Sequence, residues 1–320
     1  MTGGWWLVAS GWSSAAHCRR LTAVLILCAT AVCGLQGRQE PVFRSETRLV
    51  VLHATVRNAR GQIVAGLDSK VFAVYENGRP QPITLFRNDD VPVSVGLLID
   101  NSGSMRLLRP KIEAAALAFV RASNPDDEFF VLNFADKPRL DVPFTSDRAT
   151  LEARIARVDS IGGTALYDAV AMAQAYLRAQ AKHDRRVLLL ISDGHDNASE
   201  TPKERVRRQA ELDDVAIYAV SLSAPGDEGK ATRDEARREL DDVTEGTGGL
   251  LTFPSSIEAI NAVALEMAHQ IRSQYTIGYT PLNQALDGAY RSIRVMVAGP
   301  DRLVVRTRSG YRAIAAEPPQ

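Results

Sequence analysis

Beyond residue 33 the sequence lacks cysteine: its three cysteines in 320 residues are Cys18, Cys28 and Cys33. Most of the chain can therefore form no disulfide framework and has no thiol chemistry. The sequence also lacks excess charge, because Lys plus Arg and Asp plus Glu each number 38. A neutral chain without a basic tract gives no electrostatic reason to expect nucleic acid as a partner.

Catalytic motifs are scarce as well. The five histidines, His17, His53, His183, His195 and His269, show no metal-ligand spacing. A hydrolase of the Gly-x-Ser-x-Gly type has this motif in a sharp turn that follows a strand. Ser102 lies in "DNSGS" instead, and no histidine is placed by sequence to activate it. The phosphate-loop pattern is absent, since Gly229 and Lys230 precede Ala231 without the required upstream glycine. We therefore expect no enzymatic activity and no catalytic residues.

The first apolar run is short and follows two arginines. Leu21 to Cys33 comes after Arg19 and Arg20, and it is too short to cross a hydrocarbon core of about 30 Å. We expect residues 1–36 to be a signal peptide cleaved between about residues 31 and 37. The mature chain would be secreted, or held in the periplasm or cell envelope, and would have no transmembrane helix. An uncleaved anchor is the alternative; a lipoprotein fits less well, because neither Cys28 nor Cys33 follows the required pattern.

Three blocks follow this segment. Residues 37–90 contain branched and aromatic runs separated by turns such as "NARGQ" and "NGRP", which predicts short β-strands. In residues 91–274, apolar runs such as "VSVGLLI" and "RVLLLIS" alternate with amphipathic helical segments, which predicts a doubly wound α/β domain with a mostly parallel sheet. Residues 275–320 contain further strands and a polar tail. Because short strands are marginal alone, we expect residues 48–87 and 275–312 to pack together as one small β module.

Hydroxyl and carboxylate side chains follow the predicted parallel strands. Asp100 ends the first strand of the α/β block, and Ser102 and Ser104 follow it in "DNSGS". Thr164 in "GGT" opens a predicted helix, and Asp193 in "SDG" ends another strand. Ligands bind at the carboxyl ends of such strands, so the five side chains are expected to converge. The alternative for each alone is ordinary: Ser102, Ser104 and Thr164 as helix caps, and Asp193 with Gly194 as a turn.

These three motifs resemble the metal-ion-dependent adhesion site of the von Willebrand factor A family. "DNSGS" is similar to the family's Asp-x-Ser-x-Ser, "GGT" to its threonine loop and "SDG" to its second aspartate loop, in the same order, over about residues 91–274. The flanking segments, including "VFAVYENGRPQPITLF" and "YTIGYTP", resemble bacterial secreted von Willebrand factor A-related proteins. The resemblance implies a von Willebrand factor A fold, similar to the Rossmann arrangement, for the central block.

The resemblance also implies a metal ion and a kind of partner. Ser102, Ser104 and Thr164 would be hydroxyl ligands of Mg²⁺ or Mn²⁺, with Asp100 and Asp193 acting directly or through water. Few carboxylates and an open position suit magnesium better than calcium. An Asp or Glu carboxylate of a partner protein would complete the coordination, as is common in this family. His195, close by in "SDGHDN", would either tune the site or be a solvated loop residue.

The expected function is therefore that of an exported adhesion or interaction module that binds proteins through a metal ion. Two alternatives remain at this point. The first is an exported hydrolase that uses the same ion as a Lewis acid, which would need a positioned general base or nucleophile. The second is a structural envelope protein in which the metal only stabilises the fold.

Overall fold

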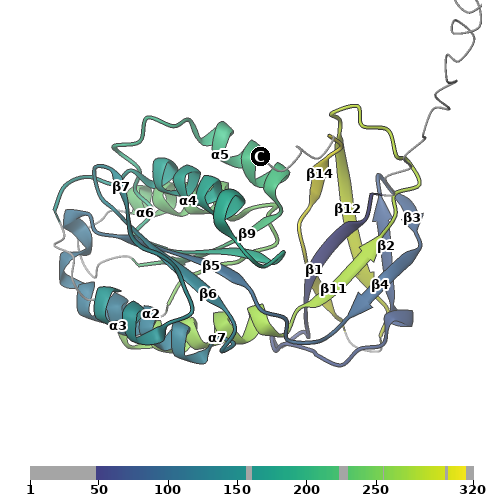
Figure 1. Cartoon of the computed structure of the whole chain (residues 1–320), viewed down its shortest axis with the longest axis horizontal. Helices are drawn as coiled ribbons and strands as arrows, with labels where there is room; N and C mark the ends of the chain where they lie inside the picture. Colours follow the sequence, from purple (N-terminus) through teal and green to yellow (C-terminus); the bar gives the residue numbers. More distant parts are fainter. Residues whose placement is uncertain (1–47, 156–160, 223–229, 255, 300–301, 315–320) are drawn as a thin grey trace, which may run out of the picture. The chain divides into compact units, whose positions relative to one another are not determined.

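The computed structural model describes residues 48–155, 161–222, 230–254, 256–299 and 302–314 (Figure 1). The expected signal peptide, residues 1–36, lies outside the described residues, as do residues 37–47 of the N-terminal block and the last part of the C-terminal tail. In the described ranges, no helix combines the length and the apolar character that a membrane span requires.

The central sheet has six strands in the order β10-β9-β8-β5-β6-β7. The strands are β5 (Ser94–Asp100), β6 (Glu128–Phe134), β7 (Pro138–Thr145), β8 (Arg186–Ser192), β9 (Val215–Ser221) and β10 (Leu251–Thr252). All neighbours pair in parallel except β7, which pairs antiparallel with β6. The predicted α/β fold with a mostly parallel sheet is confirmed. The apolar pattern of the sequence does not indicate β7, an edge strand that begins with a proline, where a missing ladder donor is tolerated.

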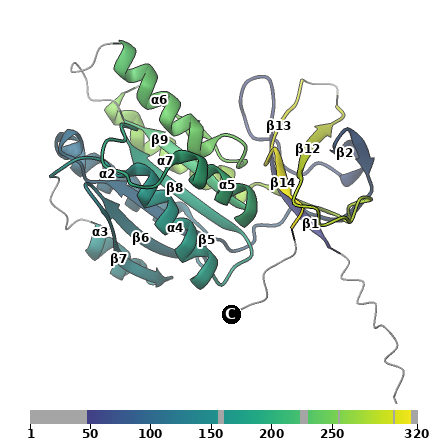
Figure 2. The ribbon, with the colours of Figure 1, turned by 90° about the horizontal axis from the view of Figure 1, so that it is seen from above.

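Helices cover both faces of this sheet (Figures 1 and 2). On one face lie α2 (Arg109–Ala122), α3 (Arg148–Ile155) and α7 (Ile260–Arg272), whose apolar sides share one core cluster. On the other face lie α4 (Leu166–Gln180), α5 (Lys203–Asp213) and α6 (Lys230–Thr244), which share the second. Burial on both faces explains why β5 and β8 are nearly continuous apolar runs.

The remaining strands form two four-stranded antiparallel sheets, β13-β1-β11-β4 and β14-β12-β2-β3. Strands from the beginning of the chain are β1 (Val50–Arg57), β2 (Phe72–Glu76), β3 (Arg79–Gln81) and β4 (Ile83–Arg87). Strands from its end are β11 (Tyr275–Tyr279), β12 (Tyr290–Val297), β13 (Val304–Arg306) and β14 (Gly310–Arg312). Each sheet mixes both groups, so the predicted pairing of the two segments is confirmed.

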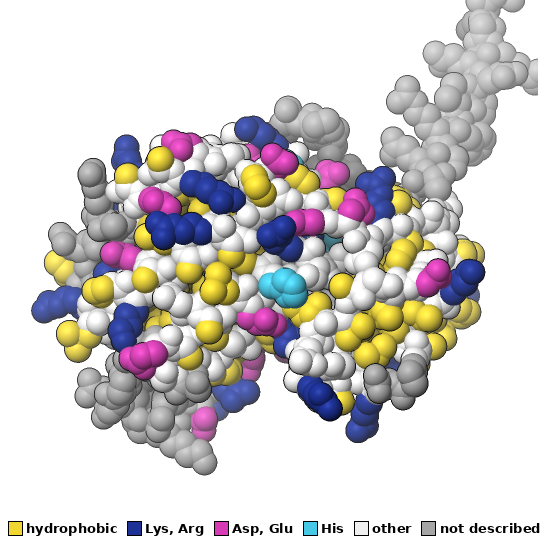
Figure 3. Space-filling model, turned by 90° about the horizontal axis from the view of Figure 1, so that it is seen from below, with side chains coloured by type: hydrophobic (Ala, Val, Ile, Leu, Met, Phe, Trp, Pro, Cys, Tyr) yellow, Lys and Arg dark blue, Asp and Glu magenta, His cyan; other side chains and the backbone are white. Residues whose placement is uncertain are grey.

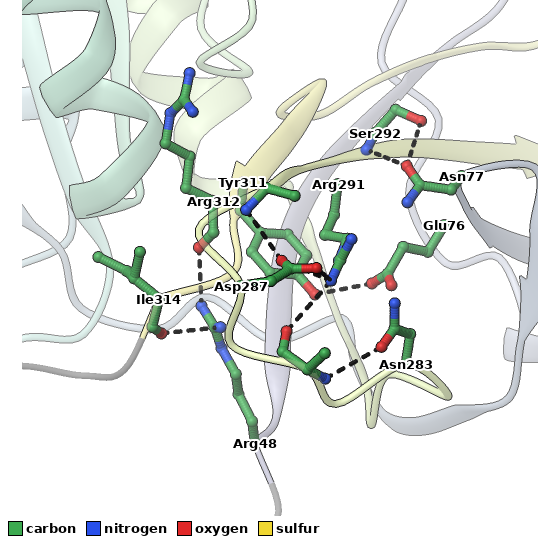
Figure 4. A network of polar contacts seen from close by, with 12 residues as sticks. Arg48, Glu76, Asn77, Asn283, Asp287, Arg291, Ser292, Tyr311, Arg312 and Ile314 are labelled. Carbon is green, nitrogen blue, oxygen red and sulfur yellow. Dashed lines mark hydrogen bonds and ion pairs between the residues drawn. The ribbon is translucent and has the colours of Figure 1, made fainter.

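A buried carboxylate, that of Glu76, joins the two sheets of this β module, and Figure 4 shows its contact with Tyr311. The Glu76 Oε2 atom accepts hydrogen bonds from the hydroxyls of Tyr279 at 2.8 Å and Tyr311 at 2.9 Å. Burial, together with this carboxylate, raises the pKa of Tyr311 to about 12, which keeps the hydroxyl protonated as a donor. Arg48 donates to the carbonyls of Arg312 and Ile314, so the two ends of the described chain lie side by side.

Surface charge is mixed rather than concentrated. On the face drawn in Figure 3, basic and acidic side chains are interspersed, and hydrophobic side chains gather over the β module. This distribution agrees with the equal numbers of acidic and basic residues in the sequence.

The strand order places a switch point beside β5. The chain continues from β5 to β6 on one side, whereas β8 joins β5 on the other side. Connections that diverge in this way leave a crevice at the carboxyl ends of the two strands. The residues that follow β5 and β8 are Asn101 and Asp193, so two of the three sequence motifs begin at this point.

Candidate metal centre

Asp100 is the last residue of β5 and is fully buried. Its Oδ1 atom accepts a hydrogen bond of 2.8 Å from the Ser102 backbone N–H, and its Oδ2 atom accepts one of 2.6 Å from the Ser192 hydroxyl. Ser192 is the last residue of the neighbouring strand β8. Both carboxylate oxygens are therefore fixed in orientation at the switch point.

Ser102 and Ser104 lie at the start of the 3₁₀ helix η2 (Gly103–Leu107). Ser102 is the N-cap residue, but its side chain makes no capping hydrogen bond. Its Oγ atom instead lies 3.0 Å from the Oγ atom of Ser104. Ser102 therefore does not act as the helix cap that was its ordinary alternative. Its hydroxyl faces the hydroxyl of Ser104 instead.

The threonine loop lies against the "DNSGS" loop. The Gly103 N–H donates to the Gly162 carbonyl at 3.1 Å. Gly162 has a φ of 100°, and a Cβ atom there would meet the Asp136 carboxylate at 2.4 Å, so a glycine is required. The prediction that Thr164 opens a helix is wrong, because α4 begins at Leu166 and has Ala165 as its N-cap. Ala165 has no side chain that can cap, and Thr164 precedes the helix by two residues.

The second aspartate loop contacts the threonine loop in turn. The Thr164 N–H donates to the Asn197 Oδ1 atom at 2.8 Å, and the Asn197 N–H donates back to the Thr164 carbonyl at 3.0 Å. Asp193 is half-buried and directly follows Ser192, the residue that holds Asp100. The structure thus brings together the three loops that carry the five predicted residues.

Two aspartate carboxylates lie close together at this point. Burial, together with the nearby charge of Asp193, raises the pKa of Asp100 to about 7, although the hydrogen bonds from Ser192 and Ser102 act in the opposite direction. Neither aspartate forms an ion pair with a described Lys, Arg or His. The carboxylates of Asp100 and Asp193 and the hydroxyls on the same three loops are hard oxygens, which are the ligands that small divalent cations prefer.

Comparison with known families identifies one domain in this chain. Residues 95–195 match the von Willebrand factor type A domain. The chain contains a von Willebrand factor A domain. The matched stretch runs from β5 to His195, and it contains all five predicted site residues. No curated protein matches the sequence.

Several solved structures are similar to this chain. A von Willebrand factor type A protein from Catenulispora acidiphila matches with a TM-score of 0.50 at 14% identity, over 85% of this chain and 75% of that chain. The pilus adhesin SpaC from Lactobacillus rhamnosus GG, in its open conformation, matches with a TM-score of 0.49 at 10% identity, over 81% and 47%. Proximal thread matrix protein 1 from the mussel byssus, solved with zinc in its MIDAS motif, matches with a TM-score of 0.47 at 18% identity, over 60% and 48%. At such identities the first match indicates the fold alone.

Several residues of the von Willebrand factor A domain that shape the site were not predicted. Ser192 holds Asp100, and Asn197 holds the Thr164 loop. The Asn101 side chain donates to Asn133 on β6 at 2.7 Å, and Asn133 donates to Asp141 on β7 at 2.6 Å. The sequence held one signal for the contact between Asn101 and Asn133. Asn133 is a polar residue inside the apolar run "EFFVLNF" of a buried strand.

The domain's site differs from metal centres rich in carboxylates or histidines. Among the described residues, no group of three or more His, Cys, Asp and Glu is placed to hold a metal ion. The five predicted residues include only two carboxylates, so this finding agrees with their composition. His195 donates its backbone N–H to Asp193 at 3.5 Å, while its Nδ1 atom is buried without a described hydrogen-bond partner.

Proposed function

We propose that this chain is a metal-dependent protein-binding module without enzymatic activity, which recruits an acidic side chain of a partner. The observation that carries the proposal is the meeting of three loops at the switch point of the sheet. There, Asp100 and Asp193 lie close to each other and neither forms an ion pair with a described Lys, Arg or His, and the Ser102 and Ser104 hydroxyls face each other.

The donor set supports Mg²⁺ or Mn²⁺. Ser102, Ser104 and Thr164 would supply neutral oxygens, and Asp100 and Asp193 would act directly or through water. Where the aspartates act through water, the protein oxygens that contact the ion directly are neutral hydroxyls, so the ion stays electrophilic toward a partner's carboxylate. The residues of this chain orient the ligands: Ser192 fixes Asp100, and Asn197 fixes the threonine loop.

A hydrolase whose nucleophile is activated by histidine lacks support in the described residues. A nucleophilic serine or threonine needs a base within hydrogen-bond reach. None of the described hydrogen bonds joins a histidine side chain to Ser102, Ser104 or Thr164. The other alternative, an envelope protein that the metal only stabilises, differs from the proposal in having no metal-dependent partner.

Metal-dependent partner binding is tested with Thr164→Ala. Losing one neutral ligand should leave a bound ion whose open position is displaced, so partner capture should fall more than Mg²⁺ affinity. The measurement is pull-down from cell-envelope extract in Mg²⁺ and in EDTA, together with calorimetric titration of Mg²⁺. Thr84→Ala on β4, in the β module, is the matched control and should behave as wild type. Capture that is equal in EDTA and in Mg²⁺ would contradict the proposal.

We also propose that the chain is exported, on the strength of the arginine pair and short apolar run at residues 19–33. The mature protein should then begin near residue 35. Mass spectrometry of protein purified from native cell envelope should recover no peptide from before residue 30. Recovery of the intact segment from Leu21 to Cys33 would indicate an uncleaved anchor instead.

A further inference from the structure

Two apolar side chains stand out in the described part of the chain by their exposure to solvent. Leu107 is 90% exposed and Ile161 is 73% exposed, more than any other large apolar side chain described. Single exposed apolar residues are common on protein surfaces. These two differ because each lies on a loop that carries a proposed metal ligand.

The 3₁₀ helix η2 fixes where Leu107 lies. In such a helix, side chains three residues apart share one face. Met105 and Leu108, three residues apart, are 0% and 4% exposed and anchor one face in the core. Ser104 and Leu107, also three apart, are both exposed. Leu107 is therefore on the same face of η2 as a proposed ligand, at an axial distance of about 6 Å.

Ile161 borders the site from the second loop. It directly precedes Gly162, whose carbonyl accepts the hydrogen bond from Gly103 in the first loop. It is three residues from Thr164, so the two Cα atoms are at most about 11 Å apart. The two apolar side chains thus come from the two loops that this hydrogen bond joins.

From this placement we propose that Leu107 and Ile161 form an apolar rim of the metal site. The rim selects a partner segment in which the acidic residue has apolar neighbours. The inference rests on the metal-dependent binding proposed above and adds the chemistry of the partner. Exposed residues beside these loops carry both signs of charge: Arg106 precedes Leu107, Asp136 accepts a hydrogen bond from the Gly163 N–H, and Lys137 follows Asp136. Because these charges do not favour one sign, the ion is the group that attracts the partner's carboxylate. Leu107 and Ile161 add apolar contact area that a purely acidic segment could not use.

The test uses the full chain and a peptide library with one fixed central aspartate and randomised neighbours. Peptides are selected in Mg²⁺ and released with EDTA from wild type, Leu107→Ser and Ile161→Ser. Wild type should enrich leucine, isoleucine, valine, methionine or phenylalanine beside the aspartate. Each variant should lose this enrichment and bind the enriched peptides roughly tenfold more weakly, as expected for a lost apolar contact. Calorimetric Mg²⁺ affinity should be unchanged, because neither side chain is a ligand.

The matched control is Leu282→Ser, because Leu282 is 68% exposed and lies in the β module between β11 and β12. It should keep both the enrichment and the affinity. The rim would be overturned if wild type selected peptides without apolar enrichment, or if both rim variants showed the same apolar enrichment as wild type. Peptide capture by wild type that EDTA does not release would instead overturn the metal-dependent function on which the rim rests.

Discussion

Replacing Asp100 by alanine should abolish Mg²⁺ and Mn²⁺ binding, and with it metal-dependent partner capture. Asp100 is one of two carboxylates at the switch point, and it is held by both the Ser102 backbone and the Ser192 hydroxyl. Alanine removes the charge and also the acceptor that orients the loop. Calorimetric titration of metal into wild type and variant is the measurement.

The fold should survive this substitution. Losing Asp100 leaves the Ser102 N–H and the Ser192 hydroxyl without this acceptor, at a cost of about 1–3 kcal/mol for each buried group. The metal-free protein gains in return, because a buried carboxylate next to Asp193 is removed. Far-UV circular dichroism and the melting temperature should therefore show a folded variant, so lost binding cannot be attributed to unfolding.

Two further variants separate charge from position. Asp100→Asn keeps the size of the side chain but not its charge, and it should also lose the metal. Asp184→Ala removes an exposed aspartate just before β8, at the opposite edge of the sheet, and should bind metal as wild type does. Metal affinity in Asp100→Ala equal to that of wild type would leave "DNSGS" as an ordinary loop after a strand.

Deleting residues 275–320 should unfold the N-terminal strands. The deletion removes β11, which lies between β1 and β4, and β12, which pairs with β2. The fully buried side chains of Tyr275, Ile277 and Tyr279 are lost from the core of the module. Limited proteolysis followed by mass spectrometry should then show rapid cleavage within residues 48–87. Resistance equal to that of the full chain would contradict the mixed sheets.

A pair of substitutions tests the same packing in the full chain. Val295 and Met296 are adjacent on β12, but Val295 is 9% exposed on the inner face and Met296 is 44% exposed on the outer face. Val295→Asp buries a charge without a partner and should destabilise the module by more than about 3 kcal/mol. Met296→Asp should leave protease resistance unchanged. The two positions differ in the face of β12 on which the side chain lies. Equal effects of the two substitutions would indicate that the face with Val295 is not the core face.

Deleting residues 275–320 should also lower the stability of the α/β domain, because the β module contacts it. The Gln274 side chain donates to the Thr55 hydroxyl at 3.2 Å on β1 and to the Tyr218 hydroxyl at 2.9 Å on β9. The Ser309 N–H donates to the Gly246 carbonyl at 2.9 Å, and Arg312 pairs with Glu211 on α5 at 2.8 Å. The last two contacts come from the deleted segment, so the α/β domain of the truncated chain should melt at a lower temperature than that of the full chain.

The sequence by itself determined the strands of the parallel sheet and the loops that follow them. Strands such as β5 and β8 are buried on both faces, so their apolar runs stop sharply where the chain leaves the core. Asp100 and Asp193 fall at these stops, and local spacing was enough to find them. The pairing of residues 48–87 with 275–312 also followed from the sequence, because neither segment could bury its strands alone.

Only the tertiary structure decided which side chains hold the site in place. The hydrogen bond between Asp100 and Ser192 spans 92 positions, and that between Asn101 and Asn133 spans 32. The β7 strand was missed for a related reason: it lies at the edge of the sheet and its burial is uneven, so it has no continuous apolar run. The start of α4 two residues after Thr164 depended on contacts between loops. Hydrophobic periodicity is a local property, whereas these contacts depend on which strands become neighbours when the sheet forms.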